Sequence, residues 1–81
     1  MAWERTYTTL TRQPDGSQAQ IDILTDSARV VDSKVFHPVM AAVYDAQGQR
    51  MFEIVEPWVT RHELCRAYGH VQEEAMRRLW S

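Results

Sequence analysis

The sequence predicts a single small α+β domain over residues 1–81, with an antiparallel sheet of three to four strands and one C-terminal amphipathic helix on one face. Two observations predict the sheet: a turn signal divides residues 3–25 into two strand-like segments, and a second one divides residues 39–55. A third predicts the helix, because a capping pattern at Thr60 precedes apolar residues at helical spacing.

The first predicted β-hairpin turns at residues 13–17. Pro14 presets φ for a turn, and Gly16 supplies a positive φ. The segment before the turn, residues 3–12, is rich in Thr, Tyr and Trp, which favour strands. After the turn, apolar and polar residues alternate from Ala19 to Ile23, which predicts a strand with one buried face.

The segment from Thr25 to Pro38 allows two interpretations. Residues 28–31 could form a short strand, or Asp26 or Ser27 could cap a single helical turn. The β-branched content favours the strand. Pro38 disfavours helical backbone at the preceding residue, so no helix should run through it.

The second predicted hairpin pairs residues 39–44 with residues 50–55 across a turn at residues 45–48. Both segments are apolar at positions of either parity, so we expect them to be covered on both faces in places. Pro57 ends the second strand, because proline cannot continue a central ladder.

The helix prediction depends on several independent local signals. Thr60 and Glu63 have the spacing of a capping box, and Val59 and Leu64 that of a hydrophobic staple. An apolar stripe at spacings of three and four follows: Leu64, Ala67, Tyr68, Val71, Ala75 and Leu79. Gly69 could break the helix, but the stripe continues in phase across it and favours one helix.

Two ion pairs at favourable i,i+4 spacing, Glu73–Arg77 and Glu74–Arg78, are expected to support the end of this helix.

The sequence argues against an enzyme, a metal site and a bound cofactor. Cys65 is the only cysteine, and with His62 and His70 it does not complete a zinc ligand set. The three glycines are scattered singly, so no phosphate-binding loop is present. A Cys65–His70 catalytic pair would require the helix to break at Gly69.

Charge and hydropathy restrict the choice of partner. The formal net charge is −2, whereas nucleic-acid binders usually carry a basic surplus. A transcriptional regulator that uses the Arg-bearing helix (Arg61, Arg66, Arg77 and Arg78) is the alternative function. No apolar stretch is long enough to span a membrane, and the single cysteine fits a reducing compartment, so we expect a cytoplasmic protein.

The leading hypothesis is a non-catalytic protein-binding or regulatory protein, similar in role to an inhibitor or adaptor. Three tryptophans in 81 residues is a high count, and aromatic residues are enriched at protein interfaces. Cys65, Met76 and Trp80 lie on a helix flank outside the apolar stripe. The predicted partner-binding residues are Trp80, Met76, Trp58 and Tyr44, with Arg77 and Arg78 at the rim. The partner would be another protein or a second copy of the chain.

Overall fold

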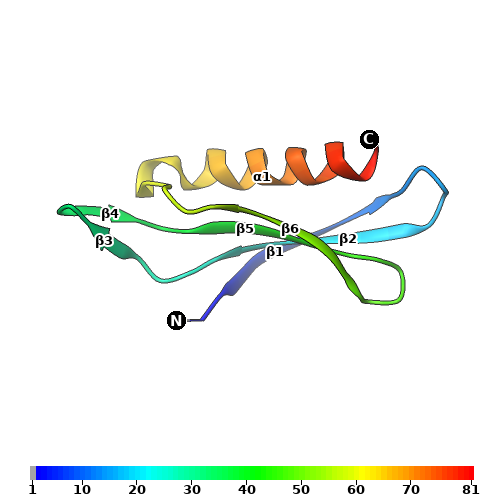
Figure 1. Cartoon of the computed structure of the whole chain (residues 1–81), viewed down its shortest axis with the longest axis horizontal. Helices are drawn as coiled ribbons and strands as arrows, with labels where there is room; N and C mark the ends of the chain where they lie inside the picture. The colour runs from blue at the N-terminus through cyan, green and yellow to red at the C-terminus, as the bar shows by residue number, and fades with distance from the viewer. Residues whose placement is uncertain (1) are drawn as a thin grey trace.

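A computed structural model describes residues 2–81, which form a four-stranded antiparallel sheet, a separate two-stranded sheet and one C-terminal helix. The predicted α+β fold is confirmed. The large sheet has the strand order β1-β2-β5-β6, with bounds Glu4–Arg12, Gln18–Thr25, Val39–Tyr44 and Arg50–Glu56. These strands form a meander that is interrupted only by the small sheet between β2 and β5 (Figure 1).

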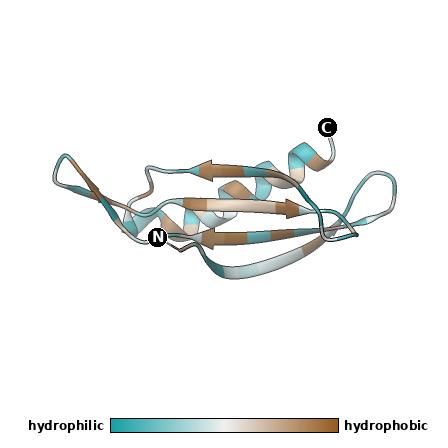
Figure 2. Ribbon diagram, turned by 60° about the horizontal axis from the view of Figure 1, so that its bottom comes forward, coloured by the Kyte–Doolittle hydropathy of each residue, from teal (hydrophilic) through white to brown (hydrophobic). Residues whose placement is uncertain are grey.

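The core is one layer of side chains between the helix and one face of the large sheet (Figure 1). The odd-numbered residues of the two central strands face the helix and are buried: Ala19, Ile21, Ile23, Val39, Ala41 and Val43. The helix α1 (Leu64–Leu79) contributes Ala67, Val71, Ala75 and Leu79. Figure 2 shows apolar residues concentrated in β2, β5 and β6, whereas the Thr-rich outer strand β1 is mostly pale. The alternation predicted for β2 therefore decides which of its faces is buried.

The opposite face of the large sheet carries no second layer within residues 2–81, yet Met40 and Ala42 on this face are buried. Ala42 lies between Asp22 and Glu53 of the neighbouring strands, whose longer side chains flank its methyl group. Asp22 is buried as well, and its carboxylate accepts hydrogen bonds from Thr8 (2.8 Å) and Gln20 (2.9 Å). The hydrogen bonds of Asp22 are thus made within the protein, on the face of the sheet that has no covering layer.

The segment that the sequence leaves open is a hairpin of two strands, β3 (Arg29–Val31) and β4 (Lys34–Phe36). The favoured short strand is confirmed, and β4 is an additional strand that the sequence analysis did not identify. Asp32 and Ser33 connect the two strands, and their φ values are 50° and 64°. Two central residues with positive φ are the mark of a type I′ turn, which usually contains Asn-Gly or Asp-Gly.

The helical segment begins with a 3₁₀ turn, η1 (Arg61–Glu63), and continues as α1 without interruption through Gly69. The predicted capping box forms at Thr60. The Glu63 carboxylate accepts hydrogen bonds from the Thr60 hydroxyl (2.7 Å) and the Thr60 backbone N–H (3.2 Å). The predicted start and the single unbroken helix are both confirmed.

Candidate functional site

The two helix-flanking tryptophans of the predicted binding site lie far apart. Trp58 precedes η1 and Trp80 follows the last residue of α1. The helix has 16 residues, so its ends are about 24 Å from each other. Both indoles are exposed, at 63% for Trp58 and 59% for Trp80. They therefore belong to different surfaces of the molecule.

Tyr44 and Met76 occupy two further places. Tyr44 lies at the end of β5, and its hydroxyl accepts a hydrogen bond from Arg50 at 3.0 Å. The Arg50 guanidinium also lies 5.5 Å from the centre of the Tyr44 ring. The hydrogen bond with Tyr44 raises the pKa of Arg50 above its ordinary value. Met76 is half-buried and packs against the core, so it is less available to a partner than an isolated flank residue would be.

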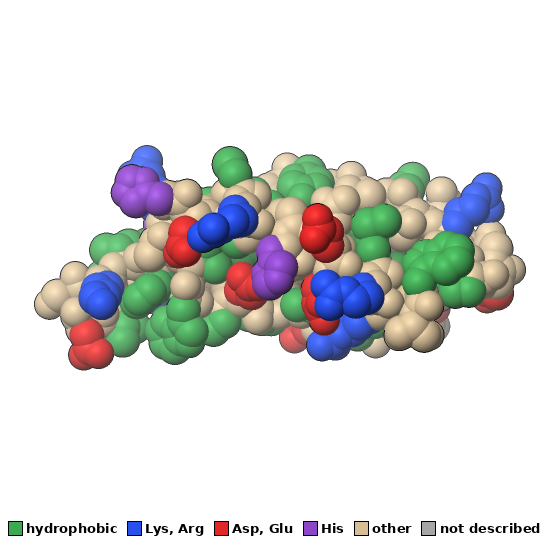
Figure 3. Space-filling model, turned by 90° about the horizontal axis from the view of Figure 1, so that it is seen from above, with side chains coloured by type: hydrophobic (Ala, Val, Ile, Leu, Met, Phe, Trp, Pro, Cys, Tyr) green, Lys and Arg blue, Asp and Glu red, His purple; other side chains and the backbone are tan. Residues whose placement is uncertain are grey.

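Arg77 and Arg78 share one acidic neighbour on the helix. Glu74 lies 2.7 Å from the Arg77 guanidinium and 3.9 Å from that of Arg78. The Arg78 guanidinium also lies 5.9 Å from the centre of the Phe52 ring on β6. The expected Glu74–Arg78 pair is thus present. The expected Glu73–Arg77 pair does not form, because Arg77 pairs with Glu74 at i,i+3 spacing instead. Figure 3 shows acidic and basic side chains mixed along this surface. Such a surface attracts phosphate groups less strongly than a purely basic stripe would.

The β3–β4 hairpin extends beyond the large sheet at one end of the molecule (Figure 1). Val30 and Val35 are directly opposite each other across its two strands and are 71% and 49% exposed. On the other face of the hairpin, Phe36 packs edge-to-face on Trp58, with ring centroids 5.3 Å apart. Figure 3 shows hydrophobic side chains grouped at this end of the molecule. We call Val30, Val31, Val35 and Trp58 the hairpin surface; Val30 and Val35 lie on one face of the hairpin, and Val31 and Trp58 on the other.

Of the predicted site residues, only Trp58 belongs to the hairpin surface. The sequence analysis missed the three valines because it left the conformation of residues 25–38 open between a short strand and a helical turn. The signal that could have identified them is the charged or polar group Asp32-Ser33-Lys34 between two valine-bearing stretches, which marks a hairpin tip.

A groove of about 530 Å³ runs between α1 and the end of β6, next to Trp58. Its charged walls come from Glu56 of β6 and from Glu63, Arg66, His70 and Glu73 of the helical segment. His70 Nδ1 contacts the Glu56 carboxylate and so ties the helix to the strand. Arg66 pairs with Glu63 at 3.1 Å. The groove is thus mixed in charge and open to solvent along one side of the helix.

Glu63 is held in its ionised form by its neighbours. Hydrogen bonds from the Thr60 hydroxyl and backbone N–H, helped by the nearby Arg66, lower the pKa of Glu63 below its ordinary value. These are capping contacts of the helix, so the shift has a structural cause and does not by itself indicate catalysis.

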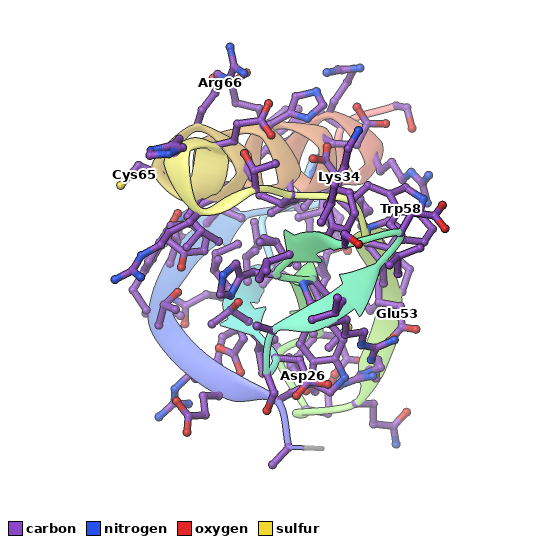
Figure 4. The ribbon with its side chains drawn as sticks, turned by 90° about the vertical axis from the view of Figure 1, so that its left-hand side faces the viewer. Asp26, Lys34, Glu53, Trp58, Cys65 and Arg66 are labelled. Carbon is purple, nitrogen blue, oxygen red and sulfur yellow. The ribbon has the colours of Figure 1, made fainter. Side chains whose placement is uncertain are left out.

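Cys65 is exposed and lines the groove together with Trp58, although its side chain points away from Trp58 in Figure 4. In the continuous helix, Cys65 and His70 project about 140° apart, so the condition for a catalytic pair, a break at Gly69, is not met. Within residues 2–81, no group of three His, Cys, Asp or Glu side chains is arranged to hold a metal ion.

Over the same residues, no helix is long and apolar enough to cross a membrane. Comparisons with protein-family models, with curated proteins and with solved structures find no match to this chain.

Proposed function

We propose that this chain is a small non-catalytic protein-binding or regulatory protein that engages a partner through the hairpin surface. The observation that carries the proposal is the solvent-facing Val30–Val35 pair on a hairpin that extends past the sheet. Contiguous exposed apolar side chains on a small domain mark interaction sites more often than isolated ones do.

Physical reasoning about the hairpin supports this role. An isolated two-stranded hairpin is only marginally stable in water. Here one face is supported by the contact of Phe36 with Trp58, while the valine pair on the other face remains open. A partner that covers Val30 and Val35 would remove apolar surface from water, and each well-covered valine would contribute about 1.5 kcal/mol.

The proposed contact is consistent with a binding hot spot. Hot spots are often aromatic residues, and Trp58 is an exposed aromatic residue on the hairpin face opposite to Val30 and Val35. A partner that contacts Trp58 as well as the valine pair would therefore enclose the hairpin from both faces. Lys34 at the hairpin tip lies on the same side as Trp58 (Figure 4) and supplies a charged rim. Trp80 and Tyr44, at other places on the molecule, are not needed for this contact.

The test compares the double variant Val30→Ser/Val35→Ser with wild type in affinity capture from host extract. Both positions are exposed, so the variant should remain folded by circular dichroism. We expect at least one protein that wild type retains to be lost from the variant.

Leu10→Ser is the matched control, because Leu10 is an exposed apolar residue on β1 outside the hairpin surface. This control should retain the partner. If the same proteins bind to all three chains, the hairpin surface is not the binding site and the proposal fails.

A further inference from the structure

The outer edge of β6 is a second feature through which the chain could associate with another strand. Within residues 2–81, β6 pairs with β5 on one side and with no strand on the other. From Phe52 to Glu56 it pairs with β5 in regular register and contains no Pro or Lys. Both outer strands carry a bulge: β1 between Arg5 and Tyr7, and β6 at Met51. Bulges, Lys and Pro are the usual protection of sheet edges, so the regular stretch from Phe52 to Glu56 is the part of β6 that is free to pair.

We propose that β6 pairs antiparallel with β6 of a second copy of this chain, with the two-fold axis at Glu53. The two four-stranded sheets would then form one continuous sheet. The inference concerns a surface separate from the hairpin surface, and it does not depend on the proposed function.

The side chains of β6 are self-complementary in this register. Phe52 comes opposite the partner's Ile54, on the helix side of the sheet. Val55 comes beside the partner's Met51, the residue at the β6 bulge, and both of these side chains are exposed in the single chain. Apolar cross-strand pairs of this kind stabilise antiparallel sheets. Pairing would therefore cover two exposed apolar side chains in each copy.

The helix position supplies an independent argument. Two contacts link α1, which packs mainly over β5, to β6: His70 with Glu56, and Arg78 with Phe52. They are about 12 Å apart along the helix and about 13 Å apart along the strand. The helix and the strand therefore run side by side with nearly equal spacing between the two contacts. Interpolation between them places Glu53 at the level of Met76 in α1. A two-fold axis at Glu53 therefore sets the two helices antiparallel about Met76.

Charge complementarity follows from this placement. Positions 70, 74, 77 and 78 share one helix face, and His70 and Arg78 show that this face is turned toward β6. Antiparallel helices centred at Met76 bring Glu74 level with the partner's Arg78 and within one residue rise, about 1.5 Å, of its Arg77. The same contact occurs twice by symmetry. The acidic part of each helix thus meets the basic end of the other.

The two Glu53 side chains are the unfavourable element of the interface. They come opposite each other at the axis, where like charges destabilise a strand pair. Each one is partly compensated by its own Arg50, which lies 2.7 Å away. Replacing Glu53 by Gln removes the repulsion and should strengthen the dimer.

The association is tested by analytical ultracentrifugation of the purified full chain. We expect a monomer–dimer equilibrium in the micromolar range, and a dissociation constant at least threefold lower for Glu53→Gln. Glu74→Arg and Arg77→Glu should each weaken the homodimer at least fivefold, because each places like charges across the axis. An equimolar mixture of these two variants should form a heterodimer as strong as wild type, since both contacts are then between opposite charges.

Cysteine cross-linking tests the register. In a Cys65→Ser background, Glu53→Cys places two thiols opposite each other, within the range of a disulfide. This variant should oxidise to a covalent dimer. Leu10→Cys on β1 is the matched control and should not. A wild-type chain that stays monomeric to millimolar concentration would overturn the proposal. Equal cross-linking of the two variants, or no recovery in the mixture, would also overturn it.

Discussion

Asp32 and Ser33 are the two residues on which the β3–β4 hairpin depends most directly. Both have left-handed backbone, where a residue with a Cβ atom is less stable than glycine. Asp tolerates this region because its short side chain can hydrogen-bond locally, whereas Ser is less suited to it. Ser33 is therefore a local site of conformational strain.

Ser33→Gly should stabilise the hairpin by about 0.5 kcal/mol, because relief of strain exceeds the added entropy of the unfolded chain. Amide hydrogen exchange of β3 and β4 would measure the effect. Ser27→Gly is the control, because Ser27 is not among the positive-φ residues, and it should leave these amides unchanged or less protected. Faster exchange in Ser33→Gly would contradict the assigned turn.

Glu63 should make the stability of the helix start depend on pH. Its pKa is lowered in the folded chain by hydrogen bonds from Thr60, so the ionised form stabilises the folded state. That stabilisation is complete above the ordinary glutamate pKa of 4.5 and is lost as the pH falls through the lowered value. The stability difference between wild type and Glu63→Gln should therefore be largest near pH 7 and smaller near pH 3. Urea unfolding at both pH values measures it; an equal difference at both would argue against the capping role.

At the scale of elements, the helix was predictable because its signals are local. The cap at Thr60, the staple and the apolar stripe all lie within a few residues of the contacts that they form. The strand β4 was not predictable in the same way, since three residues carry little periodicity and the turn before it contains no glycine. The polar residues Asp32-Ser33-Lys34 between two valine-bearing stretches are the only sequence signal of this hairpin, and they are a weaker signal than the helix cap and stripe.

Substitution of Gly69 tests whether α1 is continuous at this position. It lies inside the helix without positive φ, and a Cβ atom added there meets nothing within 4 Å. Gly69→Ala should raise the free energy of unfolding by about 1 kcal/mol, because alanine has the higher helix propensity. Thermal and urea denaturation would measure this change. A destabilised variant would indicate that the glycine is needed for a bend or a close contact.

At the scale of the whole molecule, the placement of the predicted site residues depended on tertiary structure. The sequence grouped Trp58, Trp80, Met76 and Tyr44, yet they lie at the two ends of a helix, on its flank and at the end of β5. Met76 was expected outside the buried stripe. It packs on the core because a helix lying on a sheet covers more than its central stripe. Periodicity shows which side of an element is buried, but not where separate elements meet.

The single-layer core makes Val71 important to the whole fold. Val71 is fully buried between the helix and the sheet. Val71→Ala should lower the free energy of unfolding by about 1.5 kcal/mol, because lost burial and the cavity exceed the gain in helix propensity. Val30→Ala, at an exposed position, should change it by less than about 0.5 kcal/mol. Chemical denaturation of both variants makes the comparison, and similar losses would contradict a core confined to one layer.

The order of elements along the chain has a consequence for biosynthesis. All four strands of the large sheet are synthesised before the one helix that covers their apolar face. Until the last residues leave the ribosome, Ile21, Ile23 and Val43 have no covering partner, although the strands that carry them are already complete. Such exposed apolar faces are where nascent chains aggregate or bind chaperones. We therefore expect translation that stops before α1 to yield an aggregation-prone product, even though it contains the whole sheet.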